Sequence, residues 1–333
     1  MVITRLSTLK QWAPFEIDAL GLVTMLGAEE MNLVIGQLTQ NTYTEWLPLL
    51  GAYIIANDHI TEPMPGFTLY NITDGIVATD LAGWFTRWLV CQDLTVCSST
   101  IRILPVEAKE RSLKWSYALA GLIPGLIILA GLMGDWWGVV NGAAMLISVL
   151  VRQIVVGSNR RSLDAAVEAI KSNDEVKALI SLPNGRLVTI YTSRGIVMDC
   201  LLTTPRPLNP KFYNATRTVG WAVFGAHVIS LGMASLFCQI YAVLLLLVPT
   251  VLVAKLVGNQ DTEIGRRLSM KRTDSLVRFR AAAYARLELT QVQEDAMVAW
   301  HLFPLRSNTD WWSKYEKIRA DGNFENWDNV LAQ

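Results

Sequence analysis

Residues 219–257 constrain this chain more than any other stretch, because 39 consecutive residues carry one formal charge, at Lys255. The run reads VGWAVFGAHVISLGMASLFCQIYAVLLLLVPTVLVAKLV. A single helix of this length would extend ~58 Å at ~1.5 Å per residue. The hydrocarbon core of a bilayer is only ~30 Å thick and takes ~20 residues per pass. Two helices with a short break near Ser235–Gln239 therefore fit better than one.

Residues 117–156 repeat this pattern, with charges only at Asp135 and Arg152 in 40 residues and a break at Gly134-Asp135. Arg152 lies near the end of its helix, where a long side chain reaches the membrane surface. The sequence therefore predicts an α-helical membrane protein with two transmembrane hairpins (four passes), a small α+β loop domain between them and a long helical tail. The predicted domains are an amino-terminal mixed α/β region 1–115, hairpin 116–157, loop domain 158–218, hairpin 219–258 and tail 259–333.

The loop domain has the clearest strand pattern outside the apolar runs. An amphipathic segment at 163–171 predicts a short helix, and three β-rich runs follow at 177–182, 186–192 and 196–203. Asn184-Gly185 between the first two runs is typical of a β-hairpin turn. We therefore expect a helix packed on a three-stranded meander.

The tail is expected to form one long helix, because residues 266–303 contain no Gly or Pro. At ~100° per residue, Arg267, Lys271 and Arg278 fall on one face of such a helix. A basic face of this kind binds anionic lipid at a membrane surface. The alternative is that these charges only set the orientation of the membrane helices.

Charge distribution around the apolar runs predicts the orientation. The expected turns at 133–136 and 235–239 contain no Lys or Arg, whereas basic residues flank the opposite ends of the helices. Because cytoplasmic flanks are enriched in Lys and Arg, both termini and the loop domain are expected in the cytosol. The sequons at Asn71 and Asn214 should then remain unglycosylated.

Composition argues against several classes of function. The chain is 52% hydrophobic and 17% charged, with zero formal net charge, so a nucleic-acid binder with a basic stripe is not expected. Motifs for nucleotide phosphates, for a nucleophilic serine and for zinc proteases are absent. The three histidines lie far apart in the sequence, and no metal or cofactor is predicted. Cys91 and Cys97 either pair or, as we expect, stay free thiols.

Several residues stand out as candidates for packing or function. In the third predicted pass, small residues recur every fourth position, and a GxxxG pair occurs in the first; both patterns allow close helix packing in lipid. An ionisable group inside a membrane indicates function by default, but for His227 a neutral ring hydrogen-bonded to a neighbouring helix is the preferred interpretation, because the only acidic residue in the apolar runs is Asp135, in a turn. Asp58-His59 is either an acid–base cluster or a turn. The candidates are Gly121, Gly125, Ala222, Ala226, Ser230 and Ala234 for packing, and His227, Asn141, Asp58 and His59 for function.

The segment LPNGRLVTIYTSRGIVMDCLLTTPRPLNP, residues 182–210, resembles uncharacterised multi-pass membrane proteins of filamentous fungi. The resemblance implies a lineage and no activity. Our leading hypothesis is a non-enzymatic membrane anchor or scaffold, in contact with the lipid bilayer, that presents cytosolic parts to partners. The alternative is a channel or transporter subunit that uses His227 and Asn141 in a homo-oligomer. A third hypothesis is a lipid-modifying enzyme that uses Asp58 and His59.

Overall fold

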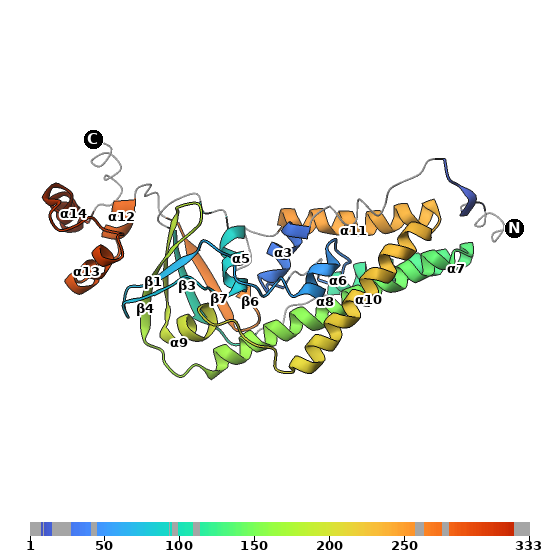
Figure 1. The fold of residues 1–333 in the computed structure, drawn as a ribbon, viewed down its shortest axis with the longest axis horizontal. Helices are drawn as coiled ribbons and strands as arrows, with labels where there is room; N and C mark the ends of the chain where they lie inside the picture. The colour runs from blue at the N-terminus through green and yellow to red at the C-terminus, as the bar shows by residue number, and fades with distance from the viewer. Residues whose placement is uncertain are drawn as a thin grey trace.

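A computed structural model describes residues 8, 10–14, 28–40, 45–92, 94, 99–108, 114–256, 263–274 and 280–322. The molecule is elongated, with a β-sheet towards one end and a bundle of helices that extends away from it (Figure 1). The long helices of the bundle are α7 (Leu122–Met133), α8 (Trp136–Ala169), α10 (Pro210–Met233) and α11 (Leu236–Leu256). A short helix, α6 (Lys114–Ala120), precedes α7.

Three helical stretches of the described chain are long and apolar enough to cross a membrane: Ser116–Met133, Trp136–Ala169 and Leu236–Lys255. The prediction of four passes is therefore wrong, because α10 is not among them. Helix α10 begins at Pro210, and its first turns carry Lys211 and Arg217, which lower its mean hydropathy. The first break lies where it was predicted, at Gly134-Asp135. The second lies at Ala234-Ser235, at the start of the predicted range Ser235–Gln239, and residues 236–239 already belong to α11.

The outer surface of the bundle is apolar. Large side chains on three different helices are more than half exposed, namely Ile128 at 63%, Ile229 at 62% and Leu244 at 53%. Soluble monomers rarely expose a contiguous apolar surface of this kind. The surface therefore agrees with the length and composition of the three apolar stretches.

The sheet has seven strands in the order β2-β1-β4-β5-β3-β7-β6, and only the β3–β5 pair is parallel. Its strands come from three regions of the sequence, so the predicted small loop domain is wrong: β4 and β5 form the middle of a larger sheet. The strands are β1 (Thr68–Asn71), β2 (Ile76–Ala78), β3 (Ser99–Pro105), β4 (Glu175–Ser181), β5 (Leu187–Ser193), β6 (Glu263–Ile264) and β7 (Leu268–Thr273).

The β4–β5 hairpin forms as predicted, and its turn residue Gly185 has φ of +77°, which favours glycine. The predicted third strand is instead helical, as α9 (Arg194–Ile196) and the π-helix η1 (Val197–Leu201). Here Ile196, Val197, Cys200 and Leu201 are all fully buried. This i, i+1, i+4, i+5 spacing places the four side chains on one face of a helix and not of a strand.

The predicted long tail helix is also wrong. Its first part is β7, in which Leu268 and Met270 are fully buried while Lys271 is exposed. This alternation has the period of a strand, and the strand completes pairing along β3. Three short helices follow: α12 (Arg280–Ala285), α13 (Gln291–Ala299) and α14 (Thr309–Asp321).

One hydrophobic core joins the sheet to the bundle. It lies between one face of the sheet and α3 (Ala28–Gly36), α5 (Gly83–Cys91), η1 and the second half of α8. Val155 and Leu163 of α8 are fully buried in this core. The tail helices form a second core against the opposite face, around Leu179 and Leu187. Helix α8 therefore belongs both to the bundle and to the sheet domain.

Candidate functional site

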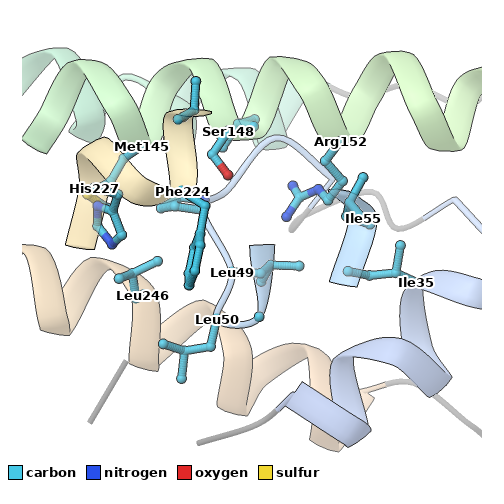
Figure 2. Close-up of a pocket in the computed structure, with 14 residues that line it drawn as sticks. Ile35, Leu49, Leu50, Ile55, Met145, Ser148, Arg152, Phe224, His227 and Leu246 are labelled. Atoms are coloured by element: carbon cyan, nitrogen blue, oxygen red, sulfur yellow. The ribbon is translucent and has the colours of Figure 1, made fainter. Parts of the chain in front are cut away.

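A narrow internal cavity lies where the bundle meets the sheet domain. Its volume of about 30 Å³ is enough for about two water molecules. Figure 2 shows polar side chains at opposite ends, with His227 at one end and Arg152 at the other, and Phe224 and Leu49 between them. The lining comes from α8 (Met145, Ser148, Arg152), α10 (Phe224, His227), α11 (Leu246) and the segment Pro48–Gly51.

The segment 45–51, which has no regular secondary structure, closes the cavity from one side. It leads into α4 (Ala52–Asn57) through Gly51, whose φ of +75° allows the sharp entry into that helix. The N–H of Leu50 donates to Thr250 Oγ1 of α11 at 3.0 Å, and the Leu50 side chain packs among the bundle helices. Irregular backbone is tolerated at membrane depth only when its polar groups are satisfied by protein.

Donors from α8 satisfy this irregular backbone. Arg152 donates from Nη2 to the carbonyl oxygens of Glu45 at 2.6 Å and of Leu47 at 2.7 Å. Gln153, on the next position of the helix, also donates to the carbonyl of Glu45. Arg152 is 8% exposed. The prediction that it reaches the membrane surface is therefore wrong, because these carbonyl acceptors hold it inside the protein.

A buried ion pair holds the start of the same segment. Arg160 Nη1 lies 2.5 Å from Glu45 Oε1. The same guanidinium donates to the carbonyl oxygens of Leu38, at 3.1 Å, and of Thr39. Paired charges with further hydrogen bonds are the form in which ions are stable when buried. The site is thus built by three polar residues of one helix, Arg152, Gln153 and Arg160, which bind the segment 45–51 and, through Arg160, also Leu38 and Thr39.

His227 and Asn141 are both buried but do not share the cavity. His227 is 7% exposed and lines it, and neither ring nitrogen has a hydrogen-bond partner in the described part of the chain. Asn141 is fully buried, also without a partner among those residues, and lies outside the cavity lining. The cavity is large enough for a water molecule that could hydrogen-bond to the His227 ring. The channel role of His227 and Asn141 stays a prediction.

Asp58 and His59 point to different partners. Asp58 accepts a hydrogen bond from Tyr213 on α10, with 2.5 Å between Tyr213 Oη and Asp58 Oδ1. His59 pairs instead with Glu62 at 2.7 Å on the surface, where both side chains are about half exposed. The structure therefore brings Asp58 together with Tyr213 and not with His59. Burial, and then the bond to Asp58, raise the pKa of Tyr213.

The predicted packing residues are distributed over different environments. Ser230 and Ala234 lie in the bundle core, whereas Ala222 and Ala226 are exposed. A Cβ atom at Gly121 would meet only the carbonyl oxygen of Ala118 in α6, at 3.1 Å, and one at Gly125 only the Tyr241 hydroxyl, at 4.0 Å. The packing role of these six residues stays a prediction.

Two glycines of α8 that are not among the predicted packing residues lie at close contacts between bundle helices. A Cβ atom at Gly138 would lie 2.9 Å from Cys238 Sγ, and one at Gly142 only 2.6 Å from Ile127 Cγ1. Gly138 and Gly142 form a second GxxxG pair, so the signal was available in the sequence.

Of the three basic tail residues predicted to share a helical face, the two described ones, Arg267 and Lys271, do not lie on a helix. Arg267 lies in the turn before β7 and pairs with Glu168 of α8 at 3.4 Å. Lys271 lies on β7, opposite Arg102 of β3. Arg278 lies outside the described residues. The basis for an anionic-lipid face on a tail helix is therefore absent.

The described cysteines, Cys91, Cys200 and Cys238, are free thiols, while Cys97 lies outside the described residues. Burial raises the pKa of Cys91 to about 11 and that of Cys200 to about 12. Neither is a thiolate nucleophile at neutral pH. Among the described side chains, no group of three or more His, Cys, Asp or Glu is arranged to hold a metal ion.

Comparison with known proteins adds no relative: no protein-family model, no curated protein and no solved structure matches the chain.

Proposed function

We propose that this protein is a non-enzymatic membrane anchor that holds a β-sheet at a fixed distance from the bilayer and presents it to a partner. The observation that supports this most is the continuity of α8 (Figure 1). Its 34 residues extend ~51 Å at ~1.5 Å per residue, longer than a membrane pass requires. The first half packs in the apolar bundle, and the second half is part of the core under the sheet.

The proposed orientation places the sheet in the cytosol. Arg161, Lys211, Arg217 and Lys255 lie at or near the ends of the bundle helices that face the sheet, and such flanks are typically cytoplasmic. The cytosolic position of the amino terminus stays a prediction; the described Lys10 donates from Nζ to the carbonyl of Gly134 at 2.8 Å, in the turn between α7 and α8 at the end of the bundle away from the sheet (Figure 1).

The face of the sheet that carries the tail helices offers a surface for a partner beyond the part covered by those helices, which reach Leu179, Leu187 and, through the carbonyl of Leu287, Lys177. A row of four residues crosses the central strands: Lys177 of β4 is opposite Tyr191 of β5, Tyr191 is opposite Arg102 of β3, and Arg102 is opposite Lys271 of β7. The Tyr191 ring lies between two cations, with Lys177 Nζ at 5.7 Å and Arg102 Cζ at 5.8 Å from its centroid. Arg102 and Lys271 are exposed. This row favours a partner with acidic side chains.

Reversal of two charges in the row tests this function. The full chain in nanodiscs is titrated into a fluorescent poly-glutamate peptide, and anisotropy measures binding. For the Arg102→Glu, Lys271→Glu double variant we expect about a tenfold loss of affinity, because exposed ion pairs contribute up to ~1 kcal/mol each and reversal adds repulsion. The control is Lys314→Glu with Lys317→Glu on α14, which changes net charge equally. Equal effects of both double variants would show that the row is not the binding surface.

A further inference from the structure

An open groove of about 420 Å³ lies on the side of the molecule where α8, α10 and the end of α4 meet. Residues 202–207 form one wall, and Asp58, Thr61, Asn159 and Tyr213 form the other. It is more than ten times larger than the internal cavity. It is also separate from the basic row on the sheet, so what it binds does not depend on the function proposed above.

The wall formed by Asp58, Asn159 and Tyr213 is a hydrogen-bonded group in which one acceptor has no donor among the described residues. Asn159 Nδ2 donates to Tyr213 Oη at 3.1 Å, and the Tyr213 hydroxyl donates to Asp58 Oδ1. Asp58 Oδ2 pairs with Arg217 at 3.4 Å. Asn159 Oδ1, however, has no partner in the described part of the chain, although the residue is only 4% exposed. A buried acceptor without a donor costs about 1–3 kcal/mol, so this atom favours a ligand that donates a hydrogen bond.

The rim of the groove has the character of a membrane interface. Leu208 is 70% exposed and Phe212 is 56% exposed, immediately after the wall formed by residues 202–207. Two exposed large apolar side chains at the start of a bundle helix are suited to the headgroup boundary of a bilayer. The lining residue Arg206 is exposed and forms no ion pair with any described residue. A guanidinium at the headgroup boundary is suited to bind a lipid phosphate.

We infer that the groove binds the headgroup of a phospholipid that carries hydrogen-bond donors, such as inositol hydroxyls or the ethanolamine ammonium. A small movement of the Asn159 side chain, whose Oδ1 is buried in the unliganded protein, lets the headgroup donor bond to that oxygen, and the phosphate pairs with Arg206. The acyl chains extend past Leu208 and Phe212 into the bilayer. Phosphatidylcholine satisfies only part of this site, because its quaternary ammonium has no N–H group to donate.

The test compares three water-soluble dioctanoyl lipids, phosphatidylinositol, phosphatidylethanolamine and phosphatidylcholine, titrated into the full chain in detergent micelles by calorimetry. We expect phosphatidylinositol or phosphatidylethanolamine to bind about tenfold more tightly than phosphatidylcholine, the worth of one well-made hydrogen bond. Whichever of these two lipids binds more tightly identifies the hydrogen-bond donor as an inositol hydroxyl or an ethanolamine ammonium. Equal affinity for all three lipids, or no binding, overturns the inference.

Two variants and one control locate the site. Asn159→Leu should lower affinity for the donor lipid to that for phosphatidylcholine, and Arg206→Gln should weaken all three lipids because the phosphate loses its partner. Arg206 is exposed, so that variant is expected to fold even if Asn159→Leu does not. The control is Asn141→Leu, since Asn141 is also a buried, unpartnered asparagine among the described residues of α8 but lies outside the groove. Unchanged binding in Arg206→Gln, or an equal loss in Asn141→Leu, refutes the placement.

Discussion

Asp135 joins the two turns of the bundle: its Oδ2 accepts a hydrogen bond from the backbone N–H of Ser235 at 2.8 Å, across 100 residues of sequence. Its Oδ1 also caps α8 by accepting from the N–H of Gly138 at 3.0 Å. One carboxylate therefore satisfies backbone donors at the start of α8 and beside the start of α11. The sequence indicated only that Asp135 lies in a turn.

Asp135→Ala should destabilise the protein by about 1–2 kcal/mol, because an N-cap is lost together with the acceptor for Ser235. Denaturant unfolding of the detergent-solubilised chain measures this difference. Asp135→Asn is the matched control, since asparagine is an equally good N-cap and should retain most of the stability. A larger loss for asparagine than for alanine would contradict the capping role.

Glu45→Ala should lower the free energy of unfolding by about 3–5 kcal/mol, because it leaves the buried guanidinium of Arg160 without its counter-charge. The control is Glu168→Ala, which removes the partner of Arg267 from a pair at 3.4 Å whose side chains are 33% and 66% exposed. That variant should change stability by less than ~1 kcal/mol. Similar effects for the two variants, in the same unfolding assay, would show that burial of the Glu45–Arg160 pair contributes little.

Gly142→Val should loosen the contact between α7 and α8, because the first added carbon already falls within 2.6 Å of Ile127. Forcing extra volume into a packed interface costs about 1–3 kcal/mol. The matched control is Gly232→Ala in α10, where an added Cβ meets nothing within 4 Å; removing a helical glycine there should stabilise by up to ~1 kcal/mol. Thermal unfolding in micelles compares the two, and a harmless Gly142→Val would argue against close packing at this position.

Stability should fall in acid partly through Asp74. The hydrogen bond from Arg194 is the largest cause that lowers the pKa of Asp74 below its ordinary value, and Arg194 Nη2 lies 2.6 Å from Asp74 Oδ1. Because the folded-state pKa is the lower one, this stabilisation is present above the unfolded pKa and is lost as pH falls through the folded pKa. The difference in unfolding free energy between wild type and Asp74→Asn should therefore shrink as the pH is lowered from 7 towards 3. A difference that does not change with pH would mean that the charge of Asp74 does not contribute to the loss of stability in acid.

Local patterns predicted the parts of the fold that depend on nearby residues. The β4–β5 hairpin was predicted from Asn184-Gly185, and the breaks in the bundle from the length of the apolar runs. The sheet itself was not predicted, because β3 pairs with β5 and β7 over long sequence distances, and pairing of distant strands leaves no periodic signal in a single sequence. The tail was predicted as a helix for the same reason. The alternation of buried and exposed residues around Leu268 and Met270 is too short to indicate a strand unless its partner β3 is known.

The candidate site was predicted only in part. His227 was identified from its place in an apolar run, and it lines the cavity. The role of Arg152, Gln153 and Arg160 was missed because their acceptors are backbone carbonyls of a distant loop, which a sequence does not distinguish from other carbonyls. The sequence did contain a signal. Arg152, Gln153 and Arg160 come at the end of an apolar run within one helix, and each polar side chain needs a hydrogen-bond partner if it is buried.

The position of β7 sets an order of events during synthesis. β3 leaves the ribosome before any bundle helix, but its partner β5 follows α8, and β7 follows α11. The edges of β3 therefore remain unpaired while the helices of the bundle are being synthesised. Unpaired edges are templates for aggregation, so a chain released before residue 273 should be a substrate for quality control, and synthesis of the whole bundle becomes a precondition for a finished sheet.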